Sequence, residues 1–107
     1  MIKSIRQLGI SPTPWVADDY RVECIGPLLG GVDWYSVCRR GGFIGDEEWK
    51  ANARLIKHAP ELYDAAHKLL AKLAYVHCDT FESRTLAVVL DNISNEQVKE
   101  NKETSND

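Results

Sequence analysis

The chain has 107 residues, 44% of them hydrophobic, and its 13 Lys and Arg against 16 Asp and Glu give a formal net charge of −3. This length predicts a single compact domain, and the acidic balance disfavours nucleic acid as a partner, because a phosphate-backbone binder usually carries a basic face. No uncharged apolar run is long enough to span a bilayer, so we expect a cytoplasmic protein that does not associate with membranes. Its three cysteines are expected to be free thiols, and they are Cys24, Cys38 and Cys78.

The first predicted element is a short helix over residues 2–8, where apolar side chains recur every third position before Gly9. Glycine is a common helix stop, because it adopts the left-handed conformation without a steric penalty. Residues 11–15 contain two prolines, each of which restricts its own backbone and that of the residue before it. We therefore expect an extended segment that brings Trp15 to the core as an anchor.

Residues 20–25 and 32–38 are the predicted strands, since the first alternates in polarity and the second is rich in β-branched and aromatic residues. Glycines in residues 26–31 predict a turn between them, and those in residues 39–42 predict a second break. A third short strand is expected over residues 42–44. Together these patterns indicate a small antiparallel sheet of two or three strands.

Two amphipathic helices are predicted over residues 46–73, broken at Pro60. Asp46 is expected to cap the first helix by accepting hydrogen bonds from free N–H groups of its first turn. Pro60 ends that helix and suits the first turn of the next one. The second helix carries an apolar stripe that is broad enough to cover a sheet. In the first helix Trp49, Ala53 and Ile56 share one face, with Leu55 beside them, and the stripe of the second comprises Leu62, Tyr63, Ala66, Leu69, Leu70 and Leu73.

A last helix is predicted over residues 81–93, although residues 86–90 also suit a buried strand. The polar residues 94–107 contain a single aliphatic side chain and are expected to form a disordered tail. The predicted architecture is therefore one α+β domain over residues 1–93. In it, the small antiparallel sheet packs against a proline-split helix pair and a C-terminal helix.

No arrangement of reactive side chains in the sequence matches a known catalytic or metal-binding pattern. The cysteines lack the close spacing of zinc ligands, and the glycine pairs at 30–31 and 41–42 lack the residues that complete a phosphate-binding loop. The adjacent His77 and Cys78 have the right types for a thiolate pair but no third orienting group. We therefore expect a protein that is not an enzyme and holds neither a metal nor a cofactor.

Basic side chains offer the one candidate site. They follow the second strand and recur on the next helix, where they could converge on an anion or on a protein partner, with an aromatic side chain as a stacking face or anchor. A solvated surface is the alternative interpretation. The candidate residues are Trp34, Tyr35, Arg39, Arg40, Arg54 and Lys57.

Two stretches of the chain carry a resemblance to known proteins. Residues 11–15 read SPTPW, and residues 51–66 read ANARLIKHAPELYDAA. Over about residues 9–73 the chain resembles a largely uncharacterised family of small phage and prophage proteins with a TPxPW … NARLIxxAPEL pattern. Ser11 stands where that pattern has threonine, and Lys57 and His58 stand where alanine is commoner.

The resemblance implies a phage-encoded protein in the bacterial host cell, and it assigns no catalytic residues. Small acidic phage proteins without catalytic signatures often bind and block host machinery. We therefore expect a binding protein that inhibits or modulates a host protein complex, for instance a CRISPR effector of antiviral defence. The alternatives are a protein that sequesters a nucleotide signal and a minor hydrolase using Cys78 or His77. A homodimer is also expected, through a sheet edge or the outer face of helix 60–73.

Overall fold

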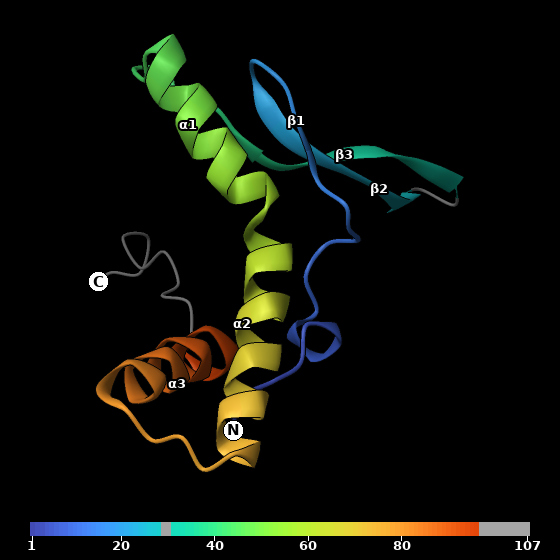
Figure 1. Ribbon diagram of the computed structural model, residues 1–107. Helices are drawn as coiled ribbons and strands as arrows, with labels where there is room; N and C mark the ends of the chain where they lie inside the picture. The colour runs from blue at the N-terminus through green and yellow to red at the C-terminus, as the bar shows by residue number, and fades with distance from the viewer. Residues whose placement is uncertain (29–30, 97–107) are drawn as a thin grey trace, which may run out of the picture.

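The computed structural model describes residues 1–28 and 31–96 and confirms a small α+β fold (Figure 1). A three-stranded antiparallel sheet with the order β1-β2-β3 precedes three helices. Strand β1 is Val16–Ala17, β2 is Arg21–Leu28 and β3 is Gly31–Arg39; helix α1 is Asp46–Lys57, α2 is Ala59–Tyr75 and α3 is Phe81–Asn95. None of the helices described is long and apolar enough to cross a membrane.

Strands β2 and β3 form a long hairpin, and buried and exposed side chains alternate along β2 as its sequence predicted. Val22 and Cys24 of β2 are fully buried, while Ile25 on the opposite face is exposed. The predicted turn at residues 26–31 begins too early, because residues 26–28 continue β2. Gly26 pairs with Asp33 in the strand, and a side chain would not fit at this position because a ring carbon of Pro12 would lie 3.0 Å from an added Cβ. Residues 29 and 30 lie outside the described part of the chain.

The third strand was predicted in the wrong place. Residues 42–44 form a turn into α1, and the third strand is the two-residue β1, which pairs with Val22 and Glu23 at the start of β2. Beyond Glu23, β2 has β3 as its only sheet partner in the described part. That edge position explains how β2 accommodates Pro27, which lacks the N–H that an inner strand would need.

Helix α1 packs against the sheet through the face that its periodicity predicted. Trp49 and Ala53 are buried against Val22, and the indole N–H of Trp49 donates to the backbone oxygen of Asp18 at 2.9 Å. This bond satisfies the polar atom of a large buried side chain. The partly buried residues around this core are Trp15, Ala17, Val37, Cys38, Ile44 and Ile56.

The start of α1 at Asp46 is confirmed, but its predicted capping role is wrong. Gly45 occupies the N-cap position, and no side chain caps the helix. The carboxylate of Asp46 instead accepts a hydrogen bond from the Arg40 guanidinium at 2.7 Å. Because Asp46 is already inside the helix, its charge still lies at the positive end of the helix dipole.

The break before Pro60 is confirmed, but α2 does not cover the sheet as predicted. The chain bends at His58, so that α1 lies on the sheet while α2 continues away from it and packs on α3 (Figure 1). Tyr63 is buried in that second packing region, whereas Leu62 and Leu69 of the predicted stripe are more than half exposed. The apolar stripe of α2 therefore packs on α3 and not on the sheet.

Helix α3 is confirmed as a helix and extends further than predicted. Its N-terminus has a reciprocal capping box between Thr80 and Ser83, which satisfies two backbone donors. Its last residues are Ser94 and Asn95, which the sequence assigned to the tail; Ser94 is buried. Residues 97–107, the remainder of the predicted tail, lie outside the described part.

The N-terminal segment lies across the α2–α3 pair rather than forming the predicted helix over residues 2–8. A single 3-10 turn, Arg6–Leu8, ends at Gly9 in the left-handed conformation (φ 73°), so the predicted glycine stop is confirmed. The Tyr63 hydroxyl donates to the backbone oxygen of Lys3 at 2.6 Å and lies 2.9 Å from the Ser94 hydroxyl. These bonds join the N-terminal segment, α2 and α3.

Candidate functional site

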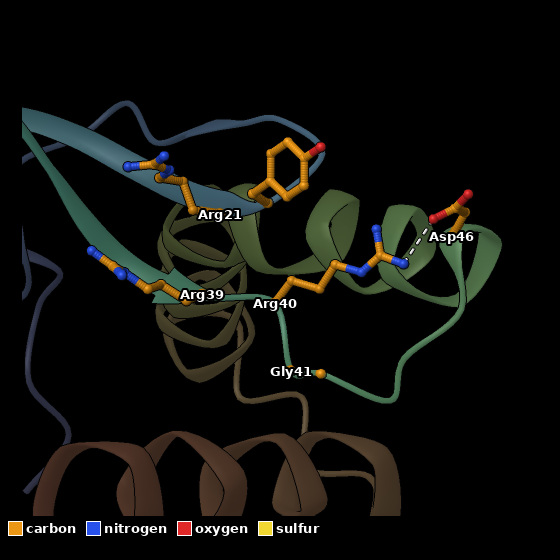
Figure 2. A pocket seen from close by; sticks show the side chains of 7 residues that line it. Arg21, Arg39, Arg40, Gly41 and Asp46 are labelled. Atoms are coloured by element: carbon orange, nitrogen blue, oxygen red, sulfur yellow. Dashed lines mark hydrogen bonds and ion pairs between the residues drawn. The ribbon is translucent and has the colours of Figure 1, made fainter.

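An open pocket of about 560 Å³ lies where β2 begins and β3 ends (Figure 2). Three arginines line it, together with one exposed tyrosine, two glycines and one carboxylate. We call it the arginine pocket, and its lining residues are Tyr20, Arg21, Arg39, Arg40, Gly41, Gly42 and Asp46.

Arg21 and Arg39 lie directly opposite each other in the register of the sheet. Like charges at directly opposed positions of an antiparallel pair destabilise it. Arg21 has a partial compensation in Glu23, at 3.6 Å, and the Arg39 side chain makes neither a hydrogen bond nor an ion pair within residues 1–28 and 31–96. Figure 2 shows both side chains extending together, away from Arg40. An anion at this position would remove the repulsion.

Arg40 has a structural role in the same pocket. Its guanidinium donates to the backbone oxygen of Ile44 and to the carboxylate of Asp46, both at 2.7 Å, and to the backbone oxygen of Asp19 at 3.3 Å. The hydrogen bond and positive charge of Arg40 lower the pKa of Asp46, so this carboxylate stays ionised and neutralises Arg40. The positive charge left for a ligand therefore belongs to Arg21 and Arg39.

Arg54 and Lys57 do not join this pocket. They lie one helical turn apart on α1 and line a separate hollow of about 190 Å³ with Lys50, Asp18 and Asp19. The pKa of Asp18 is lowered, chiefly because its carboxylate accepts a hydrogen bond from the backbone N–H of Tyr20, so a negative charge lies among these cations. The predicted patch of Arg39, Arg40 and Arg54 is thus divided into two sites.

The predicted aromatic partners, Trp34 and Tyr35, lie farther along β3 and do not line the arginine pocket. Tyr35 packs its ring on Gly26, and a hydrogen bond with the Cys24 thiol raises the pKa of its hydroxyl. Tyr20 is the aromatic residue of the pocket instead. It escaped sequence reasoning, as did Arg21, because their position opposite residues 39–40 depends on the hairpin register.

The outer surface of the hairpin is apolar. Ile25 pairs with Trp34 and Pro27 pairs with Val32, and these four residues form what we call the hairpin face. Ile25, Val32 and Trp34 are 44%, 73% and 48% exposed. Figure 1 shows this end of the hairpin extending away from the helices.

His77 and Cys78 form the end of α2. The N–H of His77 donates to Ala74 and that of Cys78 to Leu73, while His77 has a positive φ of 57°. This pattern is the Schellman motif, in which the two residues beyond the helix cap satisfy its last carbonyl groups. The adjacent histidine and cysteine therefore have a structural explanation that requires no catalysis.

The three thiols differ in their exposure to solvent. Cys24 is buried, Cys38 is partly buried, and Cys78 is exposed. In the part of the chain that the structure describes, no three His, Cys, Asp or Glu side chains gather as metal ligands would.

Comparisons of the chain with protein-family models, with curated proteins and with solved structures found no match.

Proposed function

We propose that the chain is a non-enzymatic binding protein that docks its hairpin face on a partner protein. The observation that carries the proposal is the exposed cluster of Ile25, Val32 and Trp34 on an element that extends from the body. Exposed apolar clusters of this kind mark interaction sites, and tryptophan is among the residues that most often dominate binding energy.

The inner side of the hairpin supports this role, because it holds the outer side in a fixed shape. Cys24 is fully buried, and Gly26 lies against the rings of Pro12 and Tyr35. Trp34 lies opposite Ile25 in the same ladder, so its backbone is held by paired strands. A preformed anchor loses less conformational entropy on binding than a flexible one.

A host protein complex is the partner we propose, and antiviral machinery such as a CRISPR effector is one example. The support for this setting is the resemblance of residues 11–15 and 51–66 to phage and prophage proteins. Inhibition would follow if the hairpin face occupied a surface that the host complex needs.

Affinity capture from bacterial host lysate tests the proposal when wild type is compared with two variants. Trp34→Ala removes the anchor, and Phe43→Ala removes a still more exposed aromatic side chain, from the loop before α1. We expect a stoichiometric host protein with wild type and Phe43→Ala, and at least about 30-fold weaker binding with Trp34→Ala. Equal capture by both variants, or no stoichiometric partner with wild type, would contradict the proposal.

A second candidate function is the sequestration of a small phosphate-bearing ligand, such as a nucleotide signal, in the arginine pocket. The opposed Arg21 and Arg39 favour it, because a dianion would neutralise both, and Tyr20 offers a stacking face. Calorimetry with inorganic phosphate, pyrophosphate and ATP tests it. Binding should be lost in Arg39→Glu and kept in Arg6→Glu, which makes the same charge change on an exposed residue outside the pocket.

The hydrolase alternative rests on Cys78 and His77 alone. Their place in the Schellman motif weakens its support. If a Cys78→Ala variant keeps the biological effect of the protein, the thiol is not a nucleophile in it.

A further inference from the structure

An apolar groove of about 330 Å³ runs between α2 and α3. Every residue of its lining is apolar except for the hydroxyl of Tyr63, which is already bonded to Lys3. A second apolar hollow of about 160 Å³, beneath the N-terminal segment, shares part of this lining. The groove is lined by Ala59, Leu62, Tyr63, Ala66, Leu86, Val89, Leu90 and Ile93.

Much of this lining faces solvent. Leu62 is 61% exposed, and Val89 and Ile93 are 46% and 53% exposed. Within the pair of helices, the buried apolar residues are Pro60, Tyr63 and Leu90. Such a small core does little to offset the conformational entropy lost by the 32 residues of the two helices.

The surface area of the chain leads to the same conclusion. The chain exposes 8407 Å², whereas a folded monomer of 12.1 kDa exposes about 6,000 Å². The excess is about 2,400 Å², and about 1,000 Å² remains when residues 97–107 are granted the full area of an unfolded chain, whatever their conformation. A stable interface removes about 800 Å² from each partner, so the excess is enough for one.

We propose that the α2–α3 groove is covered by the same groove of a second copy of the chain, in a symmetric homodimer. Leu62 of α2 and Val89 and Ile93 of α3 in one copy would pack into the groove of the other, giving a four-helix core across the twofold axis. This site is separate from the hairpin face, and the inference does not depend on the proposed function.

A second copy is the occupant that the observations favour. A partner that the α2–α3 pair needs for its own stability must be present whenever the chain is made, and only another copy meets that condition. Residues 97–107 cannot replace it, because their only aliphatic side chain is Val98. The apolar lining also matches the composition of obligate homodimer interfaces, which resemble a domain core cut in two.

Sedimentation of the full chain tests the dimer, and two adjacent valines test its location. Wild type should sediment at twice 12.1 kDa. Val89→Glu places a carboxylate in the groove and should weaken association on the order of 100-fold, because a buried unpaired charge is costly. Val88→Glu, on the same helix but outside the groove lining and 58% exposed, should change it less than about threefold.

A second pair of variants introduces no charge and keeps the test valid if Val89→Glu fails to fold. Leu62→Ala should weaken association about tenfold, through the loss of apolar contact, whereas Leu55→Ala on α1 should leave it unchanged. The melting temperature of wild type should also rise with protein concentration, because unfolding of the dimer includes dissociation.

Three results would overturn the inference. One is a wild-type monomer whose melting temperature is independent of concentration. Another is a dimer that persists in both Val89→Glu and Leu62→Ala, which would place the contact elsewhere. The third is equal dissociation of the groove variants and their controls. Trp34→Ala should remain dimeric, so a failure of the hairpin proposal is distinguishable from a failure of this one.

Discussion

At the scale of single residues, Arg40 shows how a side chain suited to ligand binding can serve the fold. Its guanidinium joins the loop after β1, the loop before α1 and the first residue of α1. In the sequence, Arg39 and Arg40 look equivalent. The difference lies in whether a backbone oxygen and a carboxylate come within reach, and the fold decides that.

The pair of Asp46 and Arg40 predicts a pH-dependent stability. The Arg40 hydrogen bond lowers the pKa of Asp46 below its ordinary value of 3.8. A folded-state pKa below the unfolded one means that the stabilisation is fully present above pH 3.8 and is lost as the pH falls through the folded-state pKa. Asp46→Asn should therefore melt below wild type at pH 7, and the difference should vanish in acid. A difference that stays constant down to pH 2 would contradict this.

Tyr63→Phe should destabilise the chain by about 1–2 kcal/mol, because it removes the hydroxyl that serves both Lys3 and Ser94 in a buried setting. Denaturant unfolding at one fixed protein concentration measures the loss. Tyr75→Phe is the control, since Tyr75 is 82% exposed, and it should change stability by less than about 0.5 kcal/mol. Equal effects of the two variants would show that the buried hydroxyl does not stabilise the fold.

At the scale of elements, the sequence predicted what local signals determine. The start of α1 at Asp46, the break before Pro60 and the helical state of residues 81–93 were predicted from local patterns and are confirmed, although Asp46 does not cap α1. The short strand β1 was missed, because Val16 and Ala17 are a strand only through their pairing with β2. The turn was placed too early for a similar reason, since Gly26 belongs to β2 through its pairing with Asp33.

The candidate site was predicted only in part, for the same reason. Arg39 and Arg40 are neighbours in sequence, so their common location needed no knowledge of the fold. Arg21 joins them through strand register, and Arg54 leaves them because its helix face turns toward Asp18 and Asp19. Strand register depends on where the turn of the hairpin lies, and the rotation of α1 depends on its packing against the sheet, so neither could be predicted from the basic residues alone.

The end of α2 gives an element-scale prediction. His77 has a φ of 57°, which costs a residue with a side chain about 1 kcal/mol relative to glycine. His77→Gly should therefore raise the free energy of unfolding by up to about 1 kcal/mol, net of the greater entropy that glycine gives the unfolded chain. Val76→Gly, one residue earlier with an ordinary φ of −93°, should instead destabilise. A loss of stability in both variants would argue against the Schellman motif.

At the scale of the whole molecule, two small cores are joined at the bend before Ala59. One holds Val22 and Trp49 between the sheet and α1, and the other holds Tyr63 and Leu90 between α2 and α3. Neither core includes both the hairpin and α3. The two halves are therefore expected to open separately in the native state.

Native-state hydrogen exchange of two truncations tests this separation. Leu90→Ala should cost about 2–5 kcal/mol and accelerate amide exchange in α2 and α3 more than in β2 and β3. Val22→Ala should show the reverse pattern, with the sheet and α1 affected first. Uniform acceleration across the chain in both variants would mean that the cores unfold as one unit.

The different exposure of the three thiols allows one of them to be labelled selectively with a spectroscopic probe. Cys78 is the exposed cysteine, while Cys24 is buried and Cys38 is partly shielded, so a brief reaction with a maleimide or a nitroxide should label Cys78 first. Its position just beyond α2 is fixed by the backbone bonds of the Schellman motif. One probe per chain would then report a single distance between labels in a symmetric pair of molecules, without any change to the native sequence.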